Sequence, residues 1–392
     1  MHIVFFEFVT NFGGARRSTI ETAARLTRRV QVTVVDPYGC CEPYLEAVSK
    51  ENLPLRVLKK QNPRIVGGAG EGIIRRALRL GIALPDLLHV RSKLGALIRE
   101  IRPDIICSNE TKGMAVASSL NLCPVVGYMR GWYRPDSMVP YERFMLKHKL
   151  DHLLAVSHAT RAALLCSGIK WGKISVVQNP VDVAALEEQA ARGPETPLLQ
   201  RERPVRILMA ANCIREKGQH TAIGAMGDLV KAGVDAVLYL AGGTPFSQPS
   251  VYVEDCKQLA KRLGVSDRVV WLGFRQDVPA LIKQSTIVVL PTAYPEGMPR
   301  VLLEAMALGR PVVSTPISGN TDLILDGVTG LMVEPEDPAG LAVAIQRLAH
   351  DPDEARRLSD TAQLNVNRHH SPALHTNRLL DVFKRVVKNN KH

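Results

Sequence analysis

Two glutamates stand eight positions apart in the segment YPEGMPRVLLEAMALGRPVVST, residues 294–315. Glu296 precedes a glycine and a proline, Gly297 and Pro299, so we expect it at the mouth of a helix whose first N–H groups lack partners. A carboxylate there can accept hydrogen bonds from hydroxyl groups, and the N–H groups of Gly297 and Met298 can bind an anion. An ordinary helix-capping glutamate is the alternative interpretation.

Glu304 lies about 80° around a regular helix from position 296, because each residue turns the helix by about 100°. Its neighbours in the run VLLEAMA are apolar. We therefore expect its carboxylate to be partly buried and to need hydrogen-bond partners. The vicinal hydroxyl groups of a ribose would supply them. An ordinary surface glutamate is the alternative.

Three glycine-rich or basic turns follow predicted strands, where a backbone can approach a ligand closely. NFGGARRS opens a helix, so the N–H groups near Gly13 and Gly14 favour an anion. AANCIREKGQH places Arg215 and Lys217 beside a helix N-terminus, an arrangement that a bound phosphate would stabilise. LAGGTPF, residues 240–246, is a further turn of this kind. A plain turn or an exposed basic loop is the alternative for each.

The elements that position these residues are short β-branched runs that alternate with helical patterns. This alternation predicts parallel sheets with helices on both faces. Twelve strands are expected, six on each side of a polar stretch with three prolines at residues 184–204. Because ligands bind such sheets at the carboxyl ends of the strands, all the segments above lie where a ligand site is expected.

We predict an α/β protein of two doubly wound domains that face a central cleft, since 392 residues exceed one ordinary core. Residues 1–185 form the first domain, 186–204 the linker and 205–371 the second domain. The last helix, 372–392, is expected to pack back on the first domain.

The net charge of +12 is concentrated in the first half of the chain. Residues 1–185 hold 26 Lys and Arg against 15 Asp and Glu, a difference of +11; the remainder holds 24 against 23, a difference of +1. This field implies an anionic partner for the first domain: nucleic acid, a membrane surface or an acidic substrate. A solubility surface is the alternative.

Seven scattered cysteines without a C-x-x-C pair indicate free thiols in a reducing cytosol and no zinc site. No apolar run reaches the length of a membrane span, and the start of the chain lacks the basic region of a signal peptide. We therefore expect a cytoplasmic protein, with peripheral association with the inner face of the cell membrane as an open question.

Taken in order, these segments resemble the retaining glycosyltransferases of family 4, which have the GT-B fold of two Rossmann-like domains. The E-x(7)-E element of that family matches Glu296 and Glu304, within EGMPRVLLEAMALGRPVVSTPISGNTDLILDGVTGLMVEPED. Four further segments precede this element in the chain and occur in the order typical of the family: QNPVD at 178–182, KG at 217–218, AGG at 241–243 and WLGFRQDVPALIKQSTIVVLPT at 271–292. The resemblance covers nearly the whole chain.

The resemblance implies transfer of a sugar from a nucleotide sugar, with retention at the anomeric carbon. Glu296 would hold hydroxyl groups of the donor sugar and Lys217 would neutralise its diphosphate, so these two are the expected catalytic residues. Glu304 would bind the ribose. The other implied donor-binding residues are Gly13, Gly14, Asn212, Arg215, Gly243, Phe274, Arg275, Gly297, Met298 and Pro299. No metal or other cofactor is expected, because Lys217 and helix N-termini can supply the positive charge.

Two positions depart from the family pattern. Asn212 stands where many members have an arginine, five positions before the lysine of KG, and Arg215 is the residue that could replace it. Asn109 stands where many members have a histidine that reaches the donor sugar. An amide also binds hydroxyl groups, so the identity of the sugar stays open.

Basic and aromatic residues in 64–102 and 130–149 suggest amphipathic helices on an anionic membrane, where a lipid-linked acceptor would lie. Helices packed on the first sheet, with solvated cations, are the alternative. The acceptor-side candidates are Asn109, Arg130 and Trp132.

The sequence therefore predicts a metal-independent hexosyltransferase in surface polysaccharide or lipopolysaccharide synthesis. It would move a hexose or N-acetylhexosamine to a glycan or lipid-linked acceptor, with a UDP-sugar favoured as donor and GDP-mannose next. A sugar-nucleotide epimerase on the same fold is the first rival. A non-enzymatic binder of nucleic acid or another anionic surface is the second; nucleic acid is not an expected partner, because aromatic residues make up only 5% and no binding motif is present.

Overall fold

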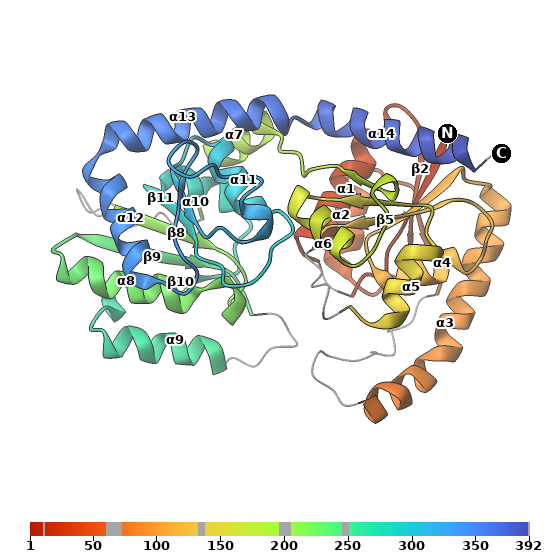
Figure 1. The fold of residues 1–392 in the computed structure, drawn as a ribbon, viewed down its shortest axis with the longest axis horizontal. Helices are drawn as coiled ribbons and strands as arrows, with labels where there is room; N and C mark the ends of the chain where they lie inside the picture. The colour runs from red at the N-terminus through yellow and green to blue at the C-terminus, as the bar shows by residue number, and fades with distance from the viewer. Residues whose placement is uncertain (11, 60–72, 132–137, 196–204, 245–250, 391–392) are drawn as a thin grey trace. The chain divides into compact units, whose positions relative to one another are not determined.

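The computed structural model describes residues 1–10, 12–59, 73–131, 138–195, 205–244 and 251–390. The chain divides into two compact units (Figure 1). The first unit comprises Met1–Asn179 and Ala373–His392, and the second comprises Pro180–Pro372. Each unit has its own parallel sheet, and helices connect its successive strands.

The first unit is built on a seven-stranded sheet in the order β3-β2-β1-β4-β5-β6-β7. Its strands are β1 (His2–Phe6), β2 (Gln31–Asp36), β3 (Leu55–Val57), β4 (Ile105–Ser108), β5 (Val125–Met129), β6 (His152–Ala155) and β7 (Ile174–Val176). Its helices are α1 (Gly14–Thr27), α2 (Glu42–Lys50), α3 (Ile73–Ile101), α4 (Thr111–Ser118), α5 (Pro140–His148), α6 (His158–Cys166), the 3-10 turn η1 (Trp171–Lys173) and α14 (Pro372–Asn389). Every residue of β1 and β5 is buried, because helices cover both faces of the sheet.

The second unit is built on a six-stranded sheet in the order β10-β9-β8-β11-β12-β13. Its strands are β8 (Val205–Ala210), β9 (Ala236–Ala241), β10 (Val269–Gly273), β11 (Ile287–Leu290), β12 (Val312–Ser314) and β13 (Leu331–Met332). Its helices are α7 (Val183–Ala191), α8 (Gln219–Lys231), α9 (Val251–Arg262), α10 (Val278–Gln284), α11 (Arg300–Ala307), α12 (Pro338–His350) and α13 (Pro352–His369), with 3-10 turns η2 (Arg215–Lys217), η3 (Ser266–Arg268) and η4 (Ser318–Asn320).

In both sheets the strand order reverses beside the first strand of the unit. β1 pairs with β2 on one side and with β4 on the other, so that Ile3 lies between Val32 and Ile105. β8 lies in the same way between β9 and β11. The loops that leave the two strands at such a reversal diverge, and they leave room for a ligand at the carboxyl ends of the strands.

The two doubly wound parallel sheets confirm the predicted fold class. All twelve predicted strands form, and the structure adds β3. The sequence did not reveal β3 because Arg56 interrupts its apolar residues and, at the edge of the sheet, none of them is fully buried.

The predicted linker, residues 186–204, begins inside a helix. Asp182 caps α7 by accepting the N–H of Ala185 at 3.1 Å, and α7 packs on α10. The second unit therefore starts at Pro180, inside the predicted first domain. The helix was missed because it buries a single side chain, Leu186, and precedes a proline-rich polar stretch, although its alanines and glutamates are strong helix formers and Asp182 is a typical N-cap.

The last helix, α14, belongs to the first unit. Its apolar side is buried and includes Leu379 and Phe383. In the first two turns of the helix, the Tyr128 hydroxyl lies 3.4 Å from His375 Nε2, and Arg29 Nη1 donates to Asn377 Oδ1 at 2.5 Å. Burial, with Arg130 nearby, lowers the pKa of His375, which favours the neutral ring.

We expect Phe383→Ala to lower the free energy of unfolding of the first unit by about 3–5 kcal/mol, because a fully buried ring is replaced by a cavity. This loss of stability would be measured by urea denaturation, with hydrogen exchange of the amides in β1 and β5 as the probe of the first unit. Lys384→Ala, on the exposed side of the same helix, is the control. An equal effect of the two substitutions would contradict the assignment of α14 to the core of the first unit.

Candidate active site

The second unit brings Lys217 and Glu296 together at the reversal of its strand order. Lys217 ends η2 in the loop after β8, and Glu296 lies in the loop after β11. The Lys217 ammonium forms an ion pair with the Glu296 carboxylate across 79 residues of sequence. The two side chains are 23% and 17% exposed, so the pair is reachable from solvent but largely enclosed by protein.

Backbone contacts hold these two loops against each other. Gly218 has φ of +84°, and a Cβ at this position would collide with the carbonyl oxygen of Pro291. Glu216 O accepts both the Ala293 N–H at 3.1 Å and the Thr292 hydroxyl at 2.7 Å. The position of Lys217 relative to the β11 loop is therefore set by the backbone, and only glycine fits at 218.

The other side of the Glu296 loop rests on η4. The Gly319 N–H donates to Glu296 O at 3.0 Å, and a Cβ on Gly319 would collide with the carbonyl oxygen of Gly297. Met298 is buried in the same loop. The Glu296 carboxylate is thus presented by a loop that is fixed on two sides.

Glu304 has a partner that the sequence analysis did not identify. Arg300 Nε donates to Glu304 Oε1 at 3.2 Å, one turn away on α11, and both side chains are largely buried. The helix starts at Arg300. Pro299 occupies the N-cap position, and its side chain makes no capping hydrogen bond. The i, i+4 spacing of opposite charges was the available signal. Glu304 is thereby oriented while one of its oxygens keeps capacity for a ligand.

Three further donor-binding candidates lie close together at the ends of β8, β9 and β10. The Cys213 N–H, directly after Asn212, donates to Gly243 O at 3.0 Å. A Cβ on Gly243 would touch Phe274 Cβ at 3.6 Å. Phe274 itself is 71% exposed, so its ring can stack on a planar ligand.

The two predicted donor-binding arginines of the second unit differ in their surroundings: Arg275 is paired with a carboxylate of the protein, and Arg215 is exposed. Arg275 forms a bidentate ion pair with Asp277, with distances of 2.8 Å and 2.5 Å, and this bond lowers the pKa of the Asp277 carboxyl. Arg215 is exposed on η2. Its charge adds to burial in lowering the pKa of His220, which lies near Glu336.

The first unit brings four predicted residues together in a pocket of about 360 Å³. Gly13 and Gly14 come from the N-terminus of α1, Asn109 follows β4, and Arg130 follows β5. The remaining lining residues are Ala15, Arg16, Glu110 and Gly131. This pocket lies at the reversal between β1 and β4, as the fold predicts. Trp132, the third acceptor-side candidate, lies outside the described residues.

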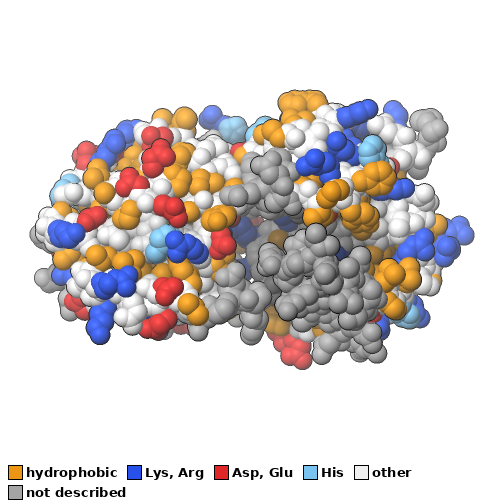
Figure 2. Space-filling model, turned by 60° about the horizontal axis from the view of Figure 1, so that its bottom comes forward, with side chains coloured by type: hydrophobic (Ala, Val, Ile, Leu, Met, Phe, Trp, Pro, Cys, Tyr) orange, Lys and Arg blue, Asp and Glu red, His pale blue; other side chains and the backbone are white. Residues whose placement is uncertain are grey.

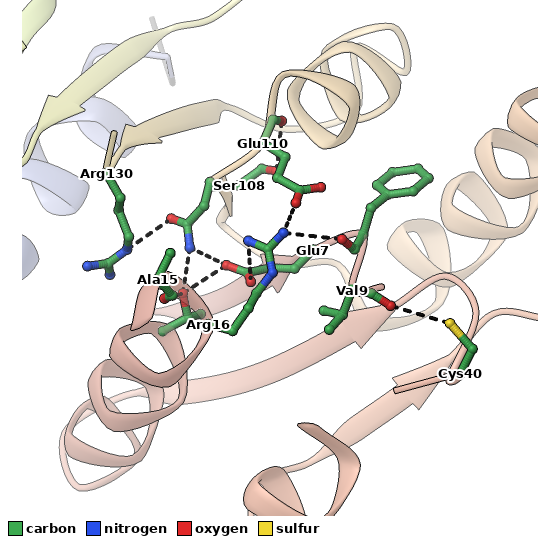
Figure 3. Close-up of polar contacts among 11 residues, drawn as sticks. Glu7, Val9, Ala15, Arg16, Cys40, Ser108, Glu110 and Arg130 are labelled. Atoms are coloured by element: carbon green, nitrogen blue, oxygen red, sulfur yellow. Dashed lines mark hydrogen bonds and ion pairs between the residues drawn. The ribbon is translucent and has the colours of Figure 1, made fainter. Parts of the chain in front are cut away.

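A buried polar network forms the floor of this pocket (Figure 3). Glu7, which is fully buried, accepts hydrogen bonds from Thr19 at 2.8 Å and from Asn109, and Arg16 Nη1 lies 3.3 Å from its second oxygen. Arg16 also pairs with Glu110. Burial raises the pKa of Glu7, and the charge of Arg16 opposes that shift.

Asn109 uses its whole amide inside this network. Its Nδ2 donates to Glu7 and, at 2.5 Å, to Thr19 Oγ1, and its Oδ1 accepts from Arg130 Nε at 3.3 Å. Arg130 is further held by Asn179 at 3.1 Å and by the Tyr128 ring, 4.0 Å below its guanidinium. In this structure Asn109 therefore orients Arg130 more than it presents an amide to the pocket. The signal for Glu7 was a charged residue inside the apolar run FFEFV.

Neither a metal cluster nor a membrane span is found in the described parts of the chain. No three His, Cys, Asp or Glu side chains among those residues gather in a way that could hold a metal ion. No helix formed by the described residues is both long enough and apolar enough to cross a bilayer.

Comparison with known proteins covers both units. The model of "Glycosyltransferase Family 4" matches residues 12–185, and that of "Glycosyl transferases group 1" matches residues 196–365. The chain is 34% identical over 163 residues to the alpha-D-kanosaminyltransferase of Streptomyces kanamyceticus, which is 41% of this chain and 40% of that protein. It is 29% identical over 209 residues to a lipopolysaccharide 1,6-galactosyltransferase of Salmonella typhimurium, 50% of this chain and 54% of that protein.

These two matches span about half of the relatives' length or less. A match over the whole fold comes from a solved structure, Anabaena Alr3699/HepE in complex with UDP-glucose, with a TM-score of 0.81 at 20% identity. It covers 98% of this chain and 100% of HepE. With two glycosyltransferase models matched in succession and the same two-sheet architecture, this chain belongs to the family 4-like glycosyltransferases of the GT-B fold.

Proposed function

We propose that the protein is a retaining hexosyltransferase that uses a UDP-sugar and extends a glycan or lipid-linked acceptor in surface polysaccharide or lipopolysaccharide synthesis. The observation that carries this proposal is the Lys217–Glu296 ion pair at the strand reversal of the second unit. The name of the Salmonella relative supports the lipopolysaccharide setting, and the UDP-glucose bound to HepE supports the donor class. GDP-mannose is the second donor candidate.

Lys217 and Glu296 have complementary tasks in this proposal. The ammonium of Lys217 binds the donor diphosphate, and the carboxylate of Glu296 accepts hydrogen bonds from hydroxyl groups of the sugar. In the ligand-free protein each neutralises the other. Donor binding exchanges that ion pair for two ligand contacts, so neither charge is left unpaired in a partly enclosed site.

In this proposal, two further residues of the second unit, Glu304 and Phe274, bind the nucleoside. Glu304, oriented by Arg300, accepts hydrogen bonds from the ribose hydroxyls. The exposed ring of Phe274 offers a surface on which the base stacks. No metal is required in this arrangement, because Lys217 and helix N-termini stabilise the charge that develops on the leaving diphosphate.

Transfer then proceeds on the same face of the sugar. The bond between the anomeric carbon and the diphosphate oxygen breaks, and a bond from that carbon to the acceptor hydroxyl oxygen forms. The proton of the acceptor hydroxyl passes to the departing phosphate oxygen. A covalent sugar–carboxylate intermediate is not needed, since Glu296 is assigned to hydroxyl binding rather than to nucleophilic attack.

We expect UDP to raise the melting temperature of the wild-type protein more than GDP or ADP does, because a ligand that binds only the folded state stabilises it. Lys217→Met and Glu304→Gln should each weaken UDP binding by about tenfold or more, since a hydrogen bond to a charged group contributes about 1.5–3 kcal/mol. Thermal-shift titration and calorimetry measure both effects.

The matched controls for nucleotide binding are Lys283→Met and Glu334→Gln, which alter exposed side chains of the second unit. UDP affinity should be unchanged in both. Wild-type affinity for UDP in Lys217→Met and Glu304→Gln would contradict the donor site, and a larger shift with GDP would move the proposal to GDP-mannose.

Glu296→Gln should reduce turnover on the order of 10²-fold while UDP affinity stays near the wild-type value, because the carboxylate contacts the sugar and not the nucleotide. With an α-linked sugar donor, the anomeric coupling constant in the NMR spectrum should identify an α-linked product. Excess EDTA should leave the rate unchanged.

Two outcomes would contradict parts of this mechanism. A β-linked product would contradict retention, and an EDTA-treated enzyme that recovers only with a divalent cation would contradict metal independence. An epimer formed from the donor alone would identify an epimerase.

A further inference from the structure

One face of the first unit combines exposed aromatic rings with basic side chains; we call it the α5 face. It consists of Tyr141, Phe144, His148 and Lys149 from α5 and its end, Arg161 from α6, and Lys170 and Trp171 from the turn that follows α6. None of these residues lines the pocket of the first unit. The face is therefore separate from the site described above.

The first component of the α5 face is a row of rings along one helix. α5 packs on its unit through Met145 and Leu146, which are buried. Tyr141, Phe144 and His148, at the spacing i, i+3, i+7, lie along one side of the helix, beside Met145 and away from Leu146. Tyr141 is 63% exposed and Phe144 is 51% exposed. Exposed rings gathered in this way are typical of an interaction surface.

The second component is the turn after α6, which contacts the end of α5. Lys173 Nζ donates to Lys147 O at 2.7 Å, and the Lys147 side chain lies over Gly168. Trp171 follows in the same turn and is 65% exposed. The C-terminal end of α5 and the turn are therefore in direct contact.

The charge of this region is strongly positive. Residues 138–175 hold six Lys and Arg against two Asp and Glu, a difference of +4. Figure 2 shows hydrophobic and basic side chains next to one another on the visible face of the first unit. An anionic surface with an apolar layer beneath it would complement both properties.

Two of the exposed rings of the α5 face, Trp171 and Phe144, are partly covered by neighbouring side chains. The Arg161 guanidinium lies 3.2 Å from the centre of the Trp171 ring and covers one of its faces. Phe144 and His148 lie 5.0 Å apart and partly cover each other. A single-stranded nucleic acid stacks its bases on open ring faces, whereas aromatic side chains beside cations suit a membrane interface. The partly covered rings therefore favour a bilayer over a nucleic acid.

We propose that the α5 face binds the surface of an anionic lipid bilayer. Tyr141, Phe144 and Trp171 enter the headgroup layer, and Lys149 and Lys170 contact its phosphates. The biological role of this binding rests on the proposed function, because a bilayer bound at the α5 face would bring a lipid-linked acceptor to the first unit. Binding to the bilayer itself does not depend on sugar transfer.

The test is sedimentation of the full-length protein with vesicles of phosphatidylcholine, either pure or mixed with about one-third phosphatidylglycerol. We expect binding to the mixed vesicles only, with a loss at high salt, because surface charges are screened there. Phe144→Ala combined with Trp171→Ala should weaken binding by about tenfold or more. Lys149→Glu combined with Lys170→Glu should do the same, since each cation near the surface contributes about 1 kcal/mol, or about fivefold.

The matched controls are Val343→Ala with Leu364→Ala, and Lys257→Glu with Lys261→Glu, which change exposed side chains of the second unit. They should bind vesicles as the wild type does. The proposal is overturned if wild type does not sediment, if it binds both vesicle types equally, or if the α5-face variants bind normally. Self-association that the same variants abolish, seen by light scattering, or salt-sensitive RNA binding through this face without vesicle binding, would assign it to another partner.

UDP affinity, measured on the same variants, separates this inference from the proposed function. The α5-face variants should bind UDP as the wild type does, and Lys217→Met should bind vesicles as the wild type does. Loss of vesicle binding with intact UDP binding tests the surface alone. A protein that binds vesicles but no nucleotide would refute the donor site and leave the α5 face in place.

Discussion

Close contact between backbones is the constraint on which the site of the second unit depends. Gly218 lies against the carbonyl group of Pro291, and Gly319 lies against that of Gly297. Neither position has room for a side chain, so the loops after β8 and β11 and the η4 turn form one rigid assembly. Lys217 and Glu296 are carried by this assembly and meet before any ligand binds. A site whose geometry exists in advance loses less entropy when it binds its ligand.

In the first unit, hydrogen bonds and ion pairs between side chains hold the pocket residues in position. Its pocket also lies at a reversal of strand order, but the floor is a buried carboxylate, Glu7, that requires partners because of its burial. Arg16, Thr19 and Asn109 supply them, and Asn109 in turn orients Arg130. Removing one member would leave buried polar groups unpaired, so the network fixes the positions of α1 and of the loop after β4 together.

Much of the fold could be predicted because its signals are local. Alternating apolar runs and helical patterns identified twelve strands, and glycine-rich turns marked the loops that carry the candidate residues. The errors came from weak local signals. In β3 a charged residue interrupts the apolar run, and α7 buries only Leu186 and precedes a stretch rich in proline and polar residues, so the predicted linker extends back over it. Helix α7 exists because it packs on α10, a contact between distant parts of the chain.

The sequence by itself determined which residues could do chemistry and at which strand ends they lie, because residue type and strand periodicity are properties of the chain. The pairing of Lys217 with Glu296, 79 residues apart, and the gathering of four predicted residues around the pocket of the first unit were decided by the tertiary structure. Spacing along the chain indicates local partners such as Arg300 for Glu304, but it does not specify which distant side chain a charged group meets. That choice depends on backbone contacts such as those at Gly218 and Gly319, and on burial, which compels Glu7 to find partners that stand up to 102 residues away.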